Sequence, residues 1–218
     1  FEFLGAEGTM AAIPSSSIQL PVLGFVDLGW FFIPFALLVI VGSTNAVNLT
    51  DGLDGLASGA MTVAIFPFLI FSYICGHLVF AKHLAVAFVP GTGELAVMCA
   101  AMIGGCLGFL WHNSHPAAVF MGDTGSLALG GAIGAIAMCS KTEVYLAIVG
   151  GIFVAEALSV IMQVGYFKAT HGKRIFKMSP IHHHFELCGW KEQKIVYTFW
   201  GITLIFCLLA LAIRLFVV

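Results

Sequence analysis

Three short polar stretches hold most of the side chains in this 218-residue sequence that could perform chemistry. Each stretch lies between long apolar segments, and two apolar segments separate each one from the next. If every apolar segment crosses a membrane, all three stretches emerge on the same side. The stretches are residues 45–56 (NAVNLTDGLDGL), 113–126 (NSHPAAVFMGDTGS) and 179–186 (SPIHHHFE).

The first stretch combines two aspartates with two asparagines. Asp51 and Asp54 are three positions apart, and Asn45 and Asn48 repeat the same offset. On a helix this offset places both carboxylates on one face, and in a loop the neighbouring glycines permit tight turns. Such oxygens suit Mg²⁺ or hydrogen bonds to sugar and base groups. The alternative is an Asp-Gly turn with asparagine caps between two helices.

The second stretch ends where an apolar helix is expected to begin. Asp123 or Thr124 can cap that helix, whose free amide groups would also attract phosphate. A carboxylate at this position disfavours a bare phosphate, but Mg²⁺ between them would form a bridge to a diphosphate. Phe120, just upstream, could stack on a base, although an interfacial anchor is the commoner role of such an aromatic residue.

The third stretch contains three consecutive histidines, His182, His183 and His184. Consecutive spacing does not match the i, i+4 arrangement by which one helix chelates zinc. Beside basic residues, these imidazoles suit phosphate binding or proton transfer. The alternative is a solvated basic loop at anionic lipid headgroups. Upstream, Gln163 follows Glu156 by seven positions on one face of a predicted span, and it could reach the same site from the end of that span.

The composition requires lipid as the solvent. The chain is 60% hydrophobic and 9% charged, whereas soluble domains are about 25% charged. A membrane-spanning helix needs about 20 mostly apolar residues. The sequence therefore predicts an all-α, polytopic membrane helix bundle in a single catalytic domain over residues 1–218, with the glycine-rich fourth span suited to close helix packing. The six predicted spans are residues 28–44, 57–80, 94–111, 125–140, 144–166 and 195–216.

The basic residues set the predicted orientation. Six of the nine Lys and Arg residues lie between the fifth and sixth predicted spans. The positive-inside rule makes that loop cytoplasmic, and counting back places the other two polar loops on the same side. The predicted cytoplasmic loops are residues 45–56, 112–124 and 167–194.

The three motifs resemble those of the polyprenyl-phosphate N-acetylhexosamine-1-phosphate transferases. The form HHHFE at 182–186 is most similar to the phospho-N-acetylmuramoyl-pentapeptide transferase (MraY) family. The resemblance implies transfer of phospho-N-acetylmuramoyl-pentapeptide from its UDP conjugate to undecaprenyl phosphate, giving lipid I and UMP for peptidoglycan synthesis. It also implies Mg²⁺ and a bacterial inner membrane, with the active site facing the cytoplasm.

The resemblance assigns roles to individual residues. Asp123 would bind Mg²⁺ at the diphosphate, with Asn48 as a second candidate ligand. Phe120 and Asn113 would line the uridine pocket, with Gln163 close to it. The remaining residues would bind nucleotide, metal, sugar or substrate phosphates and take part in catalysis: Asn45, Asn48, Asp51, Asp54, His182, His183 and His184.

One departure from the family concerns the upstream part of the enzyme. The family has about ten spanning helices and an upstream motif with adjacent aspartates. This sequence has aspartates only at 27, 51, 54 and 123, and none are adjacent. We therefore expect the sequence to be the carboxyl-terminal part of the enzyme and inactive alone.

Other functions explain the pattern less well. A sister enzyme would transfer N-acetylglucosamine-1-phosphate from UDP-N-acetylglucosamine to a polyprenyl phosphate, and substrate competition separates the two. A cation transporter would need polar residues near the middle of several spans, and here they gather at one surface. A structural scaffold leaves the Asn/Asp cluster unexplained. The expected partners are the two substrates and the bilayer, with a possible homodimer and no nucleic acid.

Overall fold

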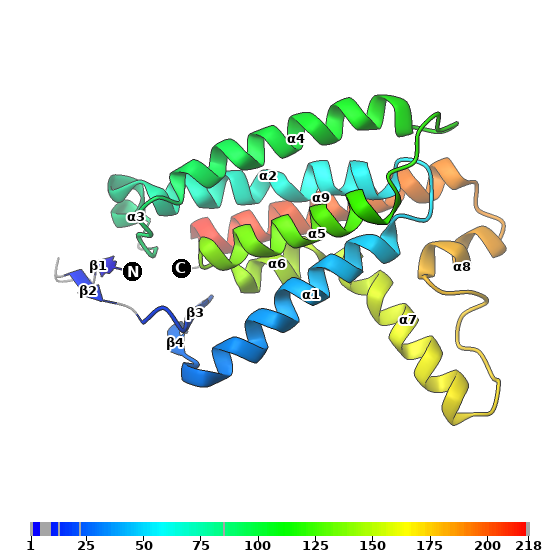
Figure 1. The fold of residues 1–218 in the computed structure, drawn as a ribbon, viewed down its shortest axis with the longest axis horizontal. Helices are drawn as coiled ribbons and strands as arrows, with labels where there is room; N and C mark the ends of the chain where they lie inside the picture. The colour runs from blue at the N-terminus through cyan, green and yellow to red at the C-terminus, as the bar shows by residue number, and fades with distance from the viewer. Residues whose placement is uncertain (1, 5–9, 13, 22, 85, 217–218) are drawn as a thin grey trace.

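The computed structural model describes residues 2–4, 10–12, 14–21, 23–84 and 86–216. Helices dominate this part of the chain, and the predicted all-α class is confirmed (Figure 1). The helices are α1 (Phe32–Thr50), α2 (Leu56–Gly76), α3 (Leu78–His83), α4 (Gly93–Asn113), α5 (Gly122–Cys139), α6 (Glu143–Val149), α7 (Gly151–Ala169), α8 (Ile181–Leu187) and α9 (Glu192–Phe216).

Two small antiparallel hairpins and one 3-10 turn precede α1. Strand β1 (Glu2–Leu4) pairs with β2 (Met10–Ala12), β3 (Ser17–Leu20) pairs with β4 (Gly24–Asp27), and the 3-10 helix η1 covers Gly29–Phe31. Within the described residues, five helical segments are long and apolar enough to cross a membrane, which confirms a polytopic bundle. They are Gly29–Thr50, Leu56–Gly76, Gly93–Asn113, Gly151–Ala169 and Glu192–Phe216.

The predicted fourth span forms α5 but is not among these five segments. This helix is short and rich in glycine, and it packs tightly against α1. A Cβ atom on Gly130 would lie 2.5 Å from the carbonyl oxygen of Ser43, and one on Gly134 would lie 2.4 Å from Ser43 Oγ. The glycines of α5 therefore permit close approach of two helix backbones, as the sequence predicted.

Two of the predicted spans are interrupted in the structure. The segment predicted at 57–80 ends as α2 at Gly76, because His77 adopts an extended conformation before α3 begins. Gly76 lies so close to α4 that a Cβ atom there would be 2.2 Å from the amide nitrogen of Gly93. The segment predicted at 144–166 is divided at Gly150 into α6 and α7. Figure 1 shows α7 diverging from α5 and α9 beyond this break.

Helix α2 is the centre of the bundle. Most of its length is buried, and it packs against both α4 and α9. At the end away from the polar loops, the buried Arg214 of α9 donates hydrogen bonds to Gln19 Oε1 at 2.6 Å and to Cys75 Sγ at 3.2 Å. Lys141 Nζ donates to the carbonyl oxygens of Ser15 and Ser17. These contacts attach the β3–β4 hairpin to the bundle.

The three polar stretches lie at the opposite end of the bundle. The loops that join α1 to α2, α4 to α5, and α7 to α9 all gather at one end in Figure 1, and the strands lie at the other. Hydrogen bonds link these loops, including one from the Asp54 amide to Glu192 and one from the Ala117 amide to Asp54. The predicted convergence of the loops is therefore confirmed.

Candidate active site

A cavity of about 240 Å³ lies where the first two polar loops meet. Its walls come from the end of α1, the loop before α2, the end of α4 and the start of α5. Six residues predicted from the sequence line it together with their neighbours. The lining residues are Asn48, Asp51, Gly52, Leu53, Asp54, Asn113, Phe120, Met121, Gly122 and Asp123.

Asn48 joins the two sides of this cavity. Its Nδ2 donates to Asp123 Oδ1 at 3.0 Å and to Ser126 Oγ at 2.9 Å. Asp123 lies in the first turn of α5, and the first residue of this helix, Gly122, has a φ of 64°. That left-handed conformation favours glycine and turns the chain into the helix. The contact between α1 and α5 thus fixes both predicted metal-binding residues at one point.

Asp51 faces an excess of negative charge. Burial raises the pKa of the Asp51 carboxyl, and the charge of Asp123 raises it further. Desolvation and a like charge both disfavour the ionised carboxylate. A divalent cation between the two residues would remove this repulsion, and oxygen ligands of this kind are those that Mg²⁺ prefers. The electrostatics of the cavity therefore fit a cation.

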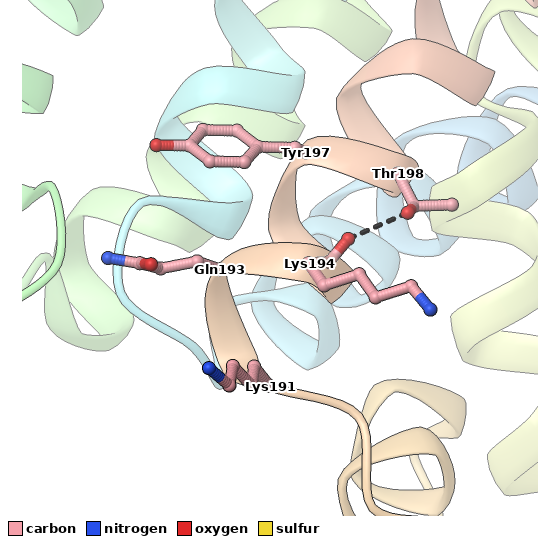
Figure 2. A pocket seen from close by; sticks show the side chains of 5 residues that line it. All are labelled: Lys191, Gln193, Lys194, Tyr197 and Thr198. Atoms are coloured by element: carbon pink, nitrogen blue, oxygen red, sulfur yellow. Dashed lines mark hydrogen bonds between the residues drawn. The ribbon is translucent and has the colours of Figure 1, made fainter.

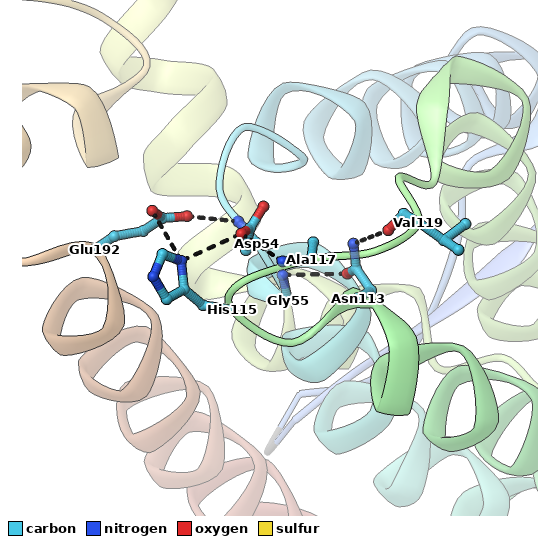
Figure 3. A network of polar contacts seen from close by, with 7 residues as sticks. All are labelled: Asp54, Gly55, Asn113, His115, Ala117, Val119 and Glu192. Atoms are coloured by element: carbon cyan, nitrogen blue, oxygen red, sulfur yellow. Dashed lines mark hydrogen bonds and ion pairs between the residues drawn. The ribbon is translucent and has the colours of Figure 1, made fainter.

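Asp54 belongs to a second polar network, shown in Figure 3. His115 Nδ1 lies 3.2 Å from Asp54 Oδ2 and 3.4 Å from Glu192 Oε2. The three residues each offer one ligand atom within 4.8 Å of the others, so they form a group that could hold a metal ion. The same distances fit an imidazole ring held between two carboxyl groups without any metal.

Asn113 is buried, and its side-chain amide bonds to three protein groups. Its Oδ1 accepts from the Gly55 amide at 3.1 Å and from Ser58 Oγ at 2.8 Å, while its Nδ2 donates to the Val119 carbonyl oxygen at 2.9 Å. These bonds hold the start of α2 against the α4–α5 loop. The geometry thus gives Asn113 a positioning role on the cavity wall, and its predicted contact with uridine stays a prediction.

Phe120 and Asn45 differ in their relation to the cavity. Phe120 lies on its wall with 74% of its surface exposed, so one ring face is free for stacking. Asn45 is exposed one turn before Asn48, and its Nδ2 donates back to the Val41 carbonyl oxygen at 2.8 Å. The residues that line the cavity do not include Asn45. Its predicted contact with nucleotide, metal or sugar stays a prediction.

The first histidine of the triplet is buried. His182 Nδ1 lies 3.1 Å from Glu156 Oε1 of α7, and both side chains are almost fully excluded from solvent. Glu156 Oε2 also accepts from the Ile181 amide at 2.8 Å. On its other side the His182 ring packs against Gly52, where a Cβ atom would lie 2.3 Å from Nε2. His182 therefore reaches the back of the loop that carries Asp51.

The other two histidines point elsewhere. His183 Nδ1 pairs with Glu186 on the same helix. His184 Nδ1 accepts from the Lys177 amide at 3.1 Å, and its Nε2 lies 3.7 Å from Cys188 Sγ. On α8, consecutive side chains point about 100° apart. The ring centroids of His182 and His183 are 4.2 Å apart, but each of the three histidines has a different polar partner. Their predicted phosphate contacts stay predictions.

Gln163 organises the loop after α7. Its Oε1 accepts from the amides of Ile175 and Phe176 at 3.0 and 2.9 Å, and its Nε2 donates to the Phe176 carbonyl oxygen at 3.1 Å. It also lines a separate cavity of about 340 Å³ beside Lys168 and Arg174. Gln163 therefore lines a different cavity from the one that Asn48 and Asp123 line.

Two further recesses flank these sites. A basic pocket of about 510 Å³ lies at the start of α9. Figure 2 shows the residues that line it, Lys191, Gln193, Lys194, Tyr197 and Thr198. A largely apolar cavity of about 400 Å³ lies farther along the bundle, with walls that include residues of α1, α6 and α7. The first is suited to anions, and the second to an apolar chain.

Sequence reasoning missed three contributors to these networks: Ser126, His115 and Glu192. Ser126 is one helical turn after Asp123, so the signal was its spacing. His115 lies inside the second polar stretch. Glu192 stands between Lys191 and Gln193 in a basic segment, where nothing local distinguishes it from a solvated charge.

The fold and the site define a multi-pass membrane protein whose carboxylates and amides converge at one end of a helix bundle. Residues 4–141, which are more than half of the sequence, match the family described as "Glycosyl transferase family 4". The chain belongs to this family.

Curated relatives narrow the resemblance. The chain is 63% identical to a phospho-N-acetylmuramoyl-pentapeptide-transferase of Thermodesulfovibrio yellowstonii over 85% of this chain and 52% of the relative. It is 60% identical to that of Desulfotalea psychrophila over the same shares, and 55% identical to that of Rickettsia canadensis over 91% and 56%. The chain spans about half the length of the curated relatives it matches. The resemblance predicted from the three motifs is confirmed.

Proposed function

We propose that this protein acts as a phospho-N-acetylmuramoyl-pentapeptide transferase. It would transfer the phospho-sugar-pentapeptide from UDP to undecaprenyl phosphate, forming lipid I and releasing UMP in peptidoglycan synthesis. Relatives with this name are 55–63% identical to the chain, and they support this choice of substrate. The observation that carries the proposal is the cavity in which Asn48, Asp51 and Asp123 converge.

The residues of this cavity fit Mg²⁺. Asp51 and Asp123 repel each other as carboxylates, and a cation between them offsets that repulsion. Asp123 and Asp51 would hold the ion. Asn48 presents Nδ2 to Asp123 in this structure, so its ligation requires the amide to rotate and present Oδ1 instead. Bound Mg²⁺ would supply neutralisation of charge on the diphosphate.

The protein groups would mainly position the substrates, since phosphoryl transfer depends chiefly on alignment and electrostatic stabilisation. Phe120 would stack on the uracil ring from the cavity wall, and Asp54 would accept a hydrogen bond from the nucleotide. The first amides of α5 would face the diphosphate. The apolar cavity beside α7 would receive the polyprenyl chain from the bilayer.

The same proposal covers location and assembly. The six basic residues between positions 168 and 194 favour a cytoplasmic position for the polar end in a bacterial inner membrane. A role in cell wall formation, and through it in cell shape and division, follows from the reaction. We also propose that the protein forms a homodimer. We expect no activity from the 218-residue chain alone, because it lacks the adjacent aspartates of the family resemblance.

The test measures Mg²⁺-dependent transfer from radiolabelled UDP-N-acetylmuramoyl-pentapeptide to undecaprenyl phosphate in membranes. One sample contains the chain alone, and another contains the chain joined to the amino-terminal half of the Thermodesulfovibrio yellowstonii relative. We expect activity in the joined enzyme only. Preference for UDP-N-acetylglucosamine in competition would indicate the sister reaction instead, and activity with neither donor would contradict the proposal.

A variant pair tests the site itself. Asp123→Asn in the joined enzyme should lower kcat about 100-fold or more, with nucleotide binding retained, because one preorganised charge contributes on this order to phosphoryl and acyl transfer. Asp27→Asn is the matched control, since Asp27 lies in β4 at the other end of the bundle. Equal turnover by the two variants would contradict a catalytic role for Asp123.

A further inference from the structure

The Asp54 side chain lies where two recesses meet. It lines the 240 Å³ cavity, and it also lines a small adjoining recess beside His115 and Tyr197. The two oxygens of its carboxylate differ. Oδ2 accepts from the Ala117 amide at 2.9 Å and approaches His115 Nδ1 at 3.2 Å. Within the described residues Oδ1 has no hydrogen-bond donor, so it is the oxygen available to a bound molecule.

Glu192 holds the backbone of the same residue. Its Oε1 accepts from the Asp54 amide at 2.9 Å, and its Oε2 lies 3.4 Å from His115 Nδ1. Glu192 is in the first turn of α9, which is far from Asp54 in sequence but beside it in Figure 3. A single side chain of the last helix thus contacts both Asp54 and the imidazole that approaches the Asp54 carboxylate.

Neither of these two residues belongs to the cavity wall. The described residues that line the 240 Å³ cavity include Asp54 but not His115 or Glu192. Any effect of these two residues on a ligand in this cavity therefore passes through Asp54. These contacts involve the carboxylates of Asp54 and Glu192, and hydrogen bonds to charged groups contribute more free energy than bonds between neutral groups.

We propose that Glu192 and His115 are positioning residues that fix the Asp54 carboxylate toward the nucleotide-binding cavity, so that α9 sets the geometry of the loop before α2. This inference rests on the proposed function for the identity of the ligand. Glu192 fixes the backbone of Asp54, and His115 fixes one carboxylate oxygen. The remaining oxygen, Oδ1, then faces the ligand in one side-chain conformation, so binding does not have to restrict the Asp54 rotamers further.

The first test is kinetic, in the joined enzyme. Glu192→Ala removes the acceptor of the Asp54 amide and should raise KM for the UDP donor about tenfold, which corresponds to loss of one hydrogen bond to a charged group. The value of kcat should stay within about twofold, because the reacting groups are untouched. Glu192→Gln keeps an oxygen acceptor and should restore most of the wild-type KM. A purely structural role would lower kcat and the amount of folded enzyme together.

The matched control is Glu94→Ala. Glu94 also lies in the first turn of a long helix, α4, but at the other end of the bundle. Its removal should leave KM unchanged. If Glu192→Ala does not fold, His115→Gln replaces it, and this variant should raise KM severalfold. A KM equal to that of Glu94→Ala in whichever variant folds overturns the inference.

The second test needs no activity. Hydrogen exchange on the full chain in detergent should show faster exchange of the Asp54 amide in Glu192→Ala than in Glu94→Ala or the wild type, with the α2 core unchanged. Equal exchange in all three overturns the inference. Faster exchange in a joined enzyme that has no transferase activity would keep the positioning contact and reject the proposed function, so the two failures are distinguishable.

Discussion

Substitution of Gly52 by alanine tests how tightly the third polar stretch is packed against the first. An ideal Cβ atom on Gly52 would lie 2.3 Å from His182 Nε2 and 2.9 Å from Cε1. Gly52 is not among the residues with positive φ, so alanine introduces no backbone strain there. The effect of the substitution is therefore purely steric. To restore ordinary contact, the imidazole would have to move by about 1 Å, a real displacement in a close-packed interior.

The ring has little freedom to make this movement. His182 is fully buried, and its other nitrogen lies 3.1 Å from the buried Glu156 carboxylate. Overpacking of this kind costs about 1–3 kcal/mol. A retreat of the ring from Gly52 also disturbs the Glu156 pair. For a chain of this size, that cost corresponds to a fall in apparent Tm of about 3–10 °C.

The assay is thermal unfolding of the purified chain in detergent, followed by circular dichroism. Gly201→Ala is the control, because a Cβ atom at Gly201 in α9 would meet nothing within 4 Å. That variant should be neutral or more stable by about 0.5–1 kcal/mol, since alanine is the better helix former. If Gly52→Ala unfolds at the same temperature as Gly201→Ala, the packing of His182 against Gly52 is wrong.

Three further substitutions test separate parts of the structure by the same unfolding assay. Asp51→Asn should be more stable than the wild type at pH 7 without Mg²⁺, because the raised pKa makes the ionised Asp51 unfavourable in the fold. This difference should vanish as the pH falls below the ordinary pKa of aspartate, and Mg²⁺ should reduce it at pH 7; a difference independent of pH would contradict the reasoning. His182→Leu should cost about 1–3 kcal/mol, because it leaves the buried Glu156 Oε1 without its partner. Adding Glu156→Gln should recover part of that loss, whereas a further loss would contradict the pairing of the two residues. Gly130→Ala should cost about 1–3 kcal/mol through its contact with the Ser43 backbone, measured against Gly104→Ala, which has open space.

The sequence predicted the all-α bundle and the convergence of its loops for a simple reason. The length of each apolar segment, and the number of such segments between two polar loops, can be read directly from the sequence. Asn48, Asp51 and Asp123 lie at or beside helix ends that must share one side, and all three line one cavity. The interruptions at His77 and Gly150 were not predictable in the same way. Both lie between apolar runs, and the break at Gly76–His77 accompanies close backbone packing against α4.

The histidine triplet shows a second limit of sequence reasoning. Consecutive residues on a short helix face different directions, so only one of the three can point inward. His182 is that residue because α7 places Glu156 opposite it, a contact between positions 26 apart in the chain. Nothing in the letters HHH distinguishes it from His183 or His184. In the same way, Glu192 gains its role from the Asp54 amide, which tertiary structure alone brings near.

Two long helices begin at the cavity, and their first turns differ in charge. The first turn of α2 holds no acidic residue, and the amides of Asp54 and Gly55 just before it are taken by Glu192 and Asn113. The first turn of α5 holds Asp123, and no side-chain cap is present at its N-terminus. At α5 the partial positive charge of a helix N-terminus therefore stands beside a carboxylate. An anion alone would be repelled by that carboxylate, and a cation alone would leave the amides unused. A diphosphate that carries Mg²⁺ would satisfy both, and this is the reason that we propose the donor diphosphate at α5 and the nucleoside toward Phe120 and Asp54.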